Sequence, residues 1–256
     1  MPNGRPRLRQ LAAILAISSA IFVGADLKGQ AGERKTGVVE LFTSQGCSSC
    51  PPADLYLGEL AKRKELLALT LPVDYWDFLG WKDTLASPAF TKRQRAYAQS
   101  RQDRNVYTPQ MVINGRVHAI GSDRKEVEAF LLATQDDFAA MAVDIDLTLD
   151  GNRLKINIGG RAAGNSAAEA TIWLVLYNRS EKVKIGRGEN TGRMITYSNV
   201  VRELVPIGMW SGEAMEISLP RKDLLQQGYD GCAVIVQAGA TGPIYGAASI
   251  ESWPED

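Results

Sequence analysis

Histidine is almost absent from this chain of 256 residues, and cysteine is rare: the sequence holds one histidine, His118, and three cysteines. A serine–histidine–aspartate hydrolase needs a histidine base, and the chain also lacks the G-x-S-x-G motif of many such enzymes. The glycine-rich stretch GRGENTGR does not have the G-x-x-x-x-G-K-S/T spacing of a phosphate-binding loop, so we expect a loop between strands there. His118 falls in an expected strand, which favours a structural role. The sequence therefore supports neither class of enzyme.

The sequence contains 29 basic and 29 acidic side chains, so neither sign of charge is in excess. Nucleic-acid-binding domains and proteins that bind anionic membranes carry a clear basic excess. The basic stretch TKRQRAYAQSRQDR falls in an expected amphipathic helix, where such charges indicate a solvated face. We therefore expect no nucleic acid and no anionic membrane surface as a partner.

Long apolar runs are missing except near the N-terminus, where LAAILAISSAIFVGA follows Arg5, Arg7 and Arg9. Spanning a bilayer takes about 20 apolar residues, and this run is shorter and interrupted by serines. A positive segment, an apolar segment and a small-residue end predict a secretory signal over residues 1–25, with an uncleaved anchor as the alternative. Cleavage near Ala25 would leave a periplasmic or secreted protein with no integral membrane segment.

The pattern after the signal predicts a small α/β domain over residues 36–138. Short β-rich runs alternate with runs of helical spacing. Ser87 is expected to cap one helix, and Asp123 with Glu126 to cap another. Asn114-Gly115 is a strong signal for a hairpin turn. The expected order is strand, helix, strand, helix, hairpin and helix.

The pattern changes after residue 138, and residues 142–256 show short strands with few helical signals. Alternating runs surround the turn Asp150-Gly151-Asn152. Further expected strands are ATIWLVLYN, EKVKIG, ITYSNVVRELV, AMEISL, CAVIVQAG and IYGAASI. Strands at this spacing predict a β-sandwich-like domain. The fold class expected for the whole chain is thus α+β or α/β, an α/β domain followed by an all-β one.

The stretch TSQGCSSCPP places Cys47 and Cys50 between an expected strand and an expected helix. Free N–H groups at a helix N-terminus favour a thiolate, which is the attacking species in disulfide exchange. We expect Cys47 to be the more exposed attacking thiol and Cys50 to be the resolving thiol. In an exported protein the two are expected to form a disulfide, which leaves Cys232 unpaired, buried and inert.

Other interpretations of the pair stay open to different degrees. A c-type haem anchor needs histidine directly after the second cysteine, and Pro51 stands there instead. A zinc site needs two more ligands, and Cys232 and His118 show no recognisable spacing. A copper(I) carrier could use the same two sulfur atoms. A purely structural disulfide is the main competing interpretation.

VVELFTSQGCSSC followed by a helix, and VYTPQMVING followed by a hairpin and a last helix, resemble the thioredoxin fold. In that family the cysteine pair faces a cis-proline loop. The resemblance implies a cis Thr108–Pro109 bond, with Thr108 and Pro109 docking the substrate chain. It also implies a buried acid behind the resolving cysteine, and Glu40 in VVELF is the residue that fits this role as proton relay. Gly46 departs from the family pattern, which has tryptophan before the first cysteine.

Along nearly its whole length, including VDYWDFLGWKD and GENTGRMITYSNVVREL, the chain resembles a family of uncharacterised exported bacterial proteins with a thioredoxin-like N-terminal half. The resemblance brings a fold but no substrate. An aromatic cluster of Tyr75, Trp76, Phe78 and Trp81 follows an expected strand end, where α/β folds place ligand sites. These rings either line a substrate groove beside Cys47 or pack the two domains together.

The sequence favours an exported thiol–disulfide oxidoreductase that acts on a protein or small-molecule thiol. Cys47 and Cys50 are the expected catalytic pair, and no metal or organic cofactor is required because the disulfide carries the two electrons. The alternatives are a non-catalytic binding module with a structural disulfide and a copper-binding thioredoxin-like protein.

Overall fold

The computed structural model describes Met1 and residues 31–162, 168–225 and 228–253, so the predicted signal segment, Met1 apart, lies outside the described residues. The elements of the N-terminal part are β1 Glu33–Lys35, β2 Gly37–Thr43, α1 Pro51–Leu60, β3 Leu66–Pro72, η1 Asp77–Leu79, α2 Pro88–Arg101, β4 Gln110–Ile113, β5 Val117–Ile120, α3 Arg124–Ala133 and α4 Gln135–Ala140. Those of the C-terminal part are β6 Ile145–Asp150, β7 Arg153–Ile158, β8 Ala170–Lys184, β9 Met194–Trp210, β10 Met215–Pro220, α5 Arg221–Leu225, β11 Gly231–Ala238 and β12 Ile244–Ile250.

Local signals in the sequence account for how several elements begin and turn. The Ser87 hydroxyl accepts a hydrogen bond from a backbone N–H in the first turn of α2, and the Asp123 carboxylate accepts one from the backbone N–H of Glu126 in α3. Asn114 and Gly115 both have positive φ, at 52° and 66°, between β4 and β5. The predicted N-caps Ser87 and Asp123 and the hairpin turn are confirmed, whereas the Asp123 N–H donates to the Ile120 carbonyl and not to the Glu126 side chain of a full capping box.

Nine strands form one curled mixed sheet in the order β1-β12-β11-β8-β9-β3-β2-β4-β5. β2 runs parallel to β3 and antiparallel to β4, and β3 meets β9 in parallel at Thr70 and Val200. Strands from both predicted domains therefore lie in one sheet, and the chain is mostly β with few helices. The stretches ATIWLVLYN and EKVKIG, predicted as two strands, are one long strand, β8, because its pairing with β9 continues past Asn178.

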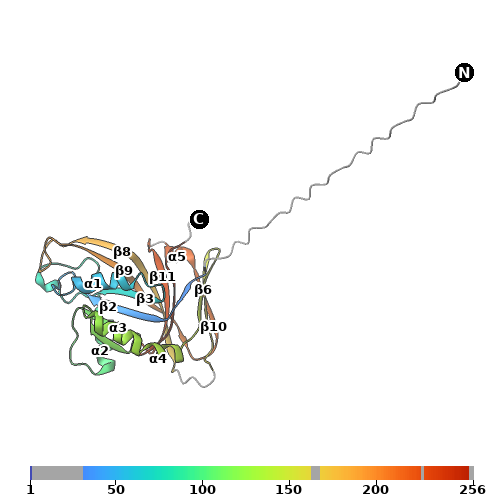
Figure 1. The fold of residues 1–256 in the computed structure, drawn as a ribbon, viewed down its shortest axis with the longest axis horizontal. Helices are drawn as coiled ribbons and strands as arrows, with labels where there is room; N and C mark the ends of the chain where they lie inside the picture. The colour runs from blue at the N-terminus through green and yellow to red at the C-terminus, as the bar shows by residue number, and fades with distance from the viewer. Residues whose placement is uncertain (2–30, 163–167, 226–227, 254–256) are drawn as a thin grey trace.

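A second sheet of three strands, β10-β7-β6, packs against the face of the large sheet formed by β8, β11 and β12. Alternate residues of β6 and β7 supply its apolar layer, as Ile145, Leu147, Leu154 and Ile156 show. In Figure 1 β6 and β10 lie at the opposite end of the molecule from α1. The two faces at which the sheets meet are therefore buried.

Helices cover both faces of the sheet around β2. Residues of α1 and α3 pack with Val39 and Leu41, whereas residues of α2 pack with Val38 and Phe42. Because successive strand residues point to opposite faces, α1 and α2 lie on opposite sides of β2. None of the helices in the described part of the chain is long and apolar enough to cross a bilayer.

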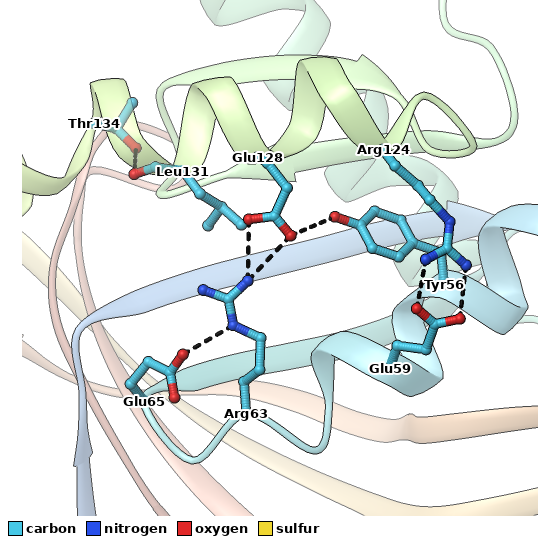
Figure 2. Close-up of polar contacts among 8 residues, drawn as sticks. All are labelled: Tyr56, Glu59, Arg63, Glu65, Arg124, Glu128, Leu131 and Thr134. Atoms are coloured by element: carbon cyan, nitrogen blue, oxygen red, sulfur yellow. Dashed lines mark hydrogen bonds and ion pairs between the residues drawn. The ribbon is translucent and has the colours of Figure 1, made fainter.

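Charged side chains join α1 to α3 on the outer surface (Figure 2). The Arg124 guanidinium makes a two-point contact with Glu59, and the Arg63 guanidinium donates to both carboxylate oxygens of Glu128 at 3.1 Å. The buried Tyr56 ring directs its hydroxyl to Glu128 at 2.8 Å. These contacts join the second half of α1, and the residue Arg63 after it, to α3.

Candidate functional site

Cys47 and Cys50 form a disulfide between the end of β2 and the start of α1, as the sequence predicts. Their Cα atoms lie 5.4 Å apart. Cys50 is the N-cap residue of α1, and its backbone N–H donates to the Cys47 carbonyl at 3.2 Å. The pair therefore closes one tight turn at the strand-to-helix junction.

Both cysteines are buried, with exposed fractions of 1% for Cys47 and 0% for Cys50, whereas Ser48 and Ser49 between them are exposed. The exposed fraction of Cys47 exceeds that of Cys50 only marginally, so its role as the attacking thiol stays a prediction. Cys47 Sγ lies 3.4 Å from the Ser49 hydroxyl. Reaction at either sulfur atom therefore requires movement of what covers the turn.

The helix N-terminus offers the pair fewer N–H groups than expected. Pro51 and Pro52 occupy its first two positions and have no N–H to donate. The next two N–H groups, of Ala53 and Asp54, both donate to the Cys50 carbonyl, at 2.9 and 3.1 Å. Stabilisation of a Cys47 thiolate by free helix N–H groups is therefore weaker than the position alone suggests.

A buried acid, Asp54, lies one helical turn after Cys50. Its side chain is 2% exposed, and its Oδ1 accepts the Thr43 hydroxyl at 2.7 Å. Among the described residues Oδ2 has no hydrogen-bond partner. Burial, opposed by the Thr43 bond and assisted by the charge of Asp83, raises the pKa of Asp54 to about 8. The raised pKa favours the protonated form of this carboxyl near neutral pH, one helical turn after Cys50.

A second buried acid, Asp83, lies next to the pair on the loop after β3. Its two carboxylate oxygens accept the backbone N–H groups of Gln45 and Leu85, at 2.8 and 2.9 Å. Burial raises the pKa of Asp83 despite these bonds. Burial also raises the pKa of Tyr197, and the charges of Asp54 and Asp83 act in the same direction. Two acids and a phenol thus share a poorly solvated site under the turn.

Glu40, the predicted proton relay, does not lie with the pair. It belongs to the face of β2 that packs against α2, opposite α1 and Cys50. Its carboxylate accepts Arg93 Nε at 2.6 Å and Nη2 at 3.1 Å, and it also accepts the hydroxyl of Tyr97. The assignment of Glu40 is corrected: it is the buried counter-ion of Arg93, and Asp54 is the acid beside Cys50.

The Thr108–Pro109 peptide bond is cis, as the resemblance implies. The Pro109 side chain approaches Gly121 together with Ala53 of α1: a Cβ atom on Gly121 would lie 3.0 Å from Ala53 Cβ and 3.3 Å from Pro109 Cβ. Glycine at position 121 thus permits close packing of the proline loop beside the first turn of α1. The structure brings Thr108 and Pro109 to the same end of the sheet as the cysteine pair.

Trp76 bridges the proline loop and the cysteine turn. Its Nε1 donates to the Thr108 hydroxyl at 2.8 Å. A Cβ atom on Gly46 would lie only 3.0 Å from Trp76 Cβ, which explains why a large side chain is not accommodated before Cys47. The ring of Trp76 is flanked by Tyr75 and by the highly exposed Phe78, with ring centroids 6.2 and 6.3 Å away.

Trp81 does not join that aromatic group. Its Nε1 donates to the Gln45 side-chain oxygen at 2.7 Å, and its ring fills the space above Gly186 in the loop between β8 and β9. The ring also packs with the cluster that contains Ile185. The packing interpretation therefore holds for Trp81, and its assignment as a substrate-binding residue is corrected.

The loop between β8 and β9, residues 186–193, contacts the cysteine turn directly; we term it the tip. The buried Asn190 side chain donates from Nδ2 to the carbonyls of Gln45 and Cys47, at 3.0 and 2.8 Å. Glu189 accepts the backbone N–H of Ser48 at 3.3 Å. Sequence reasoning missed Asn190, because GRGENTGR carries no motif that links it to a turn more than 140 residues away.

A comparison with known protein families finds a match that covers both the cysteine turn and the tip. Residues 38–237 match the family described as "Protein of unknown function (DUF1223)". The chain belongs to this family. The match to DUF1223 spans the boundary between the two predicted domains, so the family unit includes Cys47, Cys50, Asp54 and Asn190.

Two solved structures resemble this DUF1223 protein. A crystal structure of a protein from Agrobacterium tumefaciens is 33% identical, with a TM-score of 0.75 over 88% of this chain and 99% of that chain. HBP35 of Porphyromonas gingivalis is 14% identical, with a TM-score of 0.57 over 88% of this chain and 77% of that one, which is a likeness of fold alone. A search of curated proteins gives no match.

The remaining ionisable candidates in this DUF1223 chain lie apart from the pair. His118 contacts the Tyr107 hydroxyl through Nδ1 at 2.8 Å and faces Asp103, and burial lowers its pKa. Cys232 is unpaired and fully buried in β11, as predicted, and burial raises the pKa of its thiol to about 12. The described residues contain no group of three or more histidine, cysteine or acidic side chains placed to hold a metal ion.

Proposed function

We propose that this DUF1223 protein is an exported thiol–disulfide oxidoreductase with a thioredoxin-like N-terminal part. In support, the sheet order β3-β2-β4-β5 with α1 and α3 on one face and α2 on the other is the arrangement that the thioredoxin resemblance implies. The cysteine pair lies between the first strand and first helix of that arrangement. A disulfide also suits the oxidising compartment that the predicted signal segment at residues 1–25 implies.

The observation that carries the proposal is the buried carboxyl of Asp54, one helical turn after Cys50, with one oxygen that has no partner among the described residues. A purely structural disulfide does not require a buried carboxyl within one helical turn of it. Burying Asp54 with one oxygen unpartnered is unfavourable for folding, because a buried polar atom without a partner costs about 1–3 kcal/mol. A proton-transfer role for Asp54 accounts for that unfavourable arrangement.

The exchange follows from these positions. A partner thiolate attacks Cys47 Sγ, a new sulfur–sulfur bond forms, and the Cys47–Cys50 bond breaks. The electron pair of that bond leaves with Cys50, and Asp54 gives its proton to the Cys50 thiolate. A second partner thiolate then attacks the partner sulfur of the mixed disulfide and releases Cys47. The dithiol partner is oxidised by two electrons and the pair is reduced, and in the reverse direction Asp54 accepts the Cys50 proton.

Substrate docking falls to Thr108, Pro109 and the aromatic group of Tyr75, Trp76 and Phe78. The Trp76–Thr108 hydrogen bond joins the two surfaces, and the exposed Phe78 ring extends them with an apolar face. An apolar segment of a thiol-containing protein fits such a surface better than a charged ligand does. No metal or organic cofactor takes part in the proposed exchange.

The test is the reduction potential of the pair in glutathione buffers. The natural sequence can be used, because the buried Cys232 thiol does not compete. A potential between about −120 and −270 mV is expected, in the range of exchange enzymes. Cys47→Ser should abolish exchange, and Asp54→Asn should slow it while leaving the disulfide able to form. A potential below about −300 mV would contradict the proposal.

A binding module with a structural disulfide is the second candidate, and the burial of both sulfur atoms favours it. In such a protein Cys47→Ser lowers stability and changes no exchange reaction, because none exists. Asp54→Asn then has no effect on the rate at which the disulfide is reduced. The two variants together separate the candidates without knowledge of the natural partner.

A further inference from the structure

The tip of the β8–β9 hairpin is held on the cysteine turn at several points. Asn190 binds the carbonyls on both sides of Gly46, and Glu189 binds the N–H of Ser48. β9 runs beside α1, which carries Cys50 at its start (Figure 1). The C-terminal part of the chain therefore contacts the cysteine turn through this hairpin.

The tip is shaped for this contact by its own residues. Gly188 and Gly192 have φ of 82° and 81° on either side of Asn190, a conformation that favours glycine. The Trp81 ring packs under the tip, since a Cβ atom on Gly186 would lie 2.6 Å from it. The ring is itself oriented by its bond to Gln45, whose carbonyl accepts from Asn190. Tip, tryptophan and cysteine turn thus form one connected arrangement.

Access to the disulfide is blocked in this arrangement. A thiolate must reach a sulfur atom in line with the bond that breaks, and the more exposed cysteine, Cys47, shows only 1% of its surface. We propose that the tip is a cover that controls access of thiols to the Cys47–Cys50 pair, with Asn190 as the positioning residue that holds it closed. This inference rests on the proposed function and assigns a role in it to the C-terminal part.

The hydrogen bonds that hold the tip are few and uncharged at Asn190, so opening is accessible by thermal motion. Neutral hydrogen bonds contribute modestly on balance, so removal of two changes the opening equilibrium about tenfold. A cover obstructs reduction and reoxidation alike. Loss of the cover therefore speeds both reactions by a similar factor and leaves their ratio unchanged.

The experiment is stopped-flow reduction of the disulfide by dithiothreitol, followed by reoxidation with oxidised glutathione, for the natural chain and three variants. Dithiothreitol supplies both electrons and closes to its own disulfide, so the reaction balances without another reagent. Asn190→Ala removes both carbonyl contacts, and Glu189→Ala removes the exposed contact to Ser48. Asn199→Gly is the control, because the Asn199 amide also donates to a backbone carbonyl, that of Ala68 at 2.9 Å, from the same hairpin, and glycine tolerates the φ of 46° at this position.

We expect Asn190→Ala to raise both rate constants about tenfold and Glu189→Ala to raise them about threefold, with Asn199→Gly within about twofold of the natural chain. The proposal is overturned if Asn190→Ala reacts at the natural rate, if the control accelerates equally, or if only the reduction rate changes. If Asn190→Ala does not fold, the exposed Glu189→Ala variant decides by the same criteria. A reduction potential typical of a structural disulfide would refute the proposed function. The rates of reduction and reoxidation would still show whether the tip covers the pair.

Discussion

Asp54 makes the stability of the protein depend on pH in a direction opposite to that of most carboxylates. Its pKa is about 8 in the folded protein against an ordinary 3.8, so the folded state keeps a proton that the unfolded state has lost. The contribution of Asp54 to the free energy of unfolding should therefore be greatest below about pH 4. Between about pH 4 and pH 8 it should fall, by at most about 1.4 kcal/mol per pH unit. Urea unfolding of Asp54→Asn should show that this slope is removed.

The control for that measurement is Asp123→Asn, which changes an exposed acid that caps α3. Asparagine is an equally good N-cap, so this variant should keep both the stability and the pH slope of the natural chain. Above pH 8 the Asp54→Asn variant should exceed the natural chain in stability, because a neutral amide replaces a buried charge. An unchanged slope in Asp54→Asn would show that another group causes the pH dependence.

Glu40 is expected to matter for folding and not for exchange. The Glu40→Gln variant leaves the buried Arg93 guanidinium without its counter-ion, and breaking a buried pair in this way costs about 3–5 kcal/mol. The reduction potential should stay as in the natural chain, because Glu40 lies on the opposite face of β2 from α1. Chemical denaturation and glutathione titration measure the two effects. A shifted potential with unchanged stability would restore Glu40 as the relay.

The two acids also show where sequence reasoning reaches its limit at this scale. Glu40 stands out because a charge within the apolar run VVELF is unusual, whereas Asp54 resembles the ordinary acid of a helix first turn. Whether a first-turn acid faces solvent or the protein interior depends on what packs over the helix. Here β9 lies against α1, and a Cβ atom on Gly58 would be 3.0 Å from the hydroxyl of Ser198. No local pattern encodes that contact.

At the scale of the elements, strands and helices follow from the sequence where turn and capping chemistry is explicit. Ser87, Asp123 and Asn114-Gly115 each fix one boundary correctly, because their effects act within four residues. The boundary expected near Asn178 is absent, since pairing with β9 carries the strand through a polar stretch. Element type is therefore local information, and element length is set by the partner strand.

The contact between α1 and α3 gives a prediction at this scale. Tyr56→Phe removes the hydroxyl that donates to Glu128 but keeps the buried ring, and Arg63 still satisfies the carboxylate (Figure 2). The loss should be about 1 kcal/mol in the free energy of unfolding, the net value of one hydrogen bond. Urea denaturation measures it, and the rate of disulfide reduction should not change. A loss above about 3 kcal/mol would mean that the ring had moved as well.

At the scale of the whole molecule, the sequence predicts two domains but the sheet joins them. The pairing of Thr70 with Val200, reinforced by the Thr70 hydroxyl donating to the Ser198 carbonyl at 2.6 Å, connects strands about 130 residues apart. A pairing at that separation leaves no trace in local periodicity, and the predicted boundary near residue 140 reflects only the change from helical to strand patterns. The contact between Asn190 and the cysteine turn also joins residues far apart in the sequence, so local patterns do not reveal it.

One apolar cluster also draws residues from both parts: Val38, Phe42 and Leu69 pack in it with Tyr177 and Ile235. Neither part can bury these side chains alone, so we expect the full chain to unfold in one cooperative transition. Hydrogen exchange measured by mass spectrometry should give the same opening free energy for β2 and β11. A fragment of residues 36–138 should bind a hydrophobic dye and lack cooperative unfolding, because it exposes this face. A lower opening free energy for β2 and β3 than for β8 and β11 would instead establish two separately folding domains joined by the sheet. Cooperative unfolding of the fragment would establish the same.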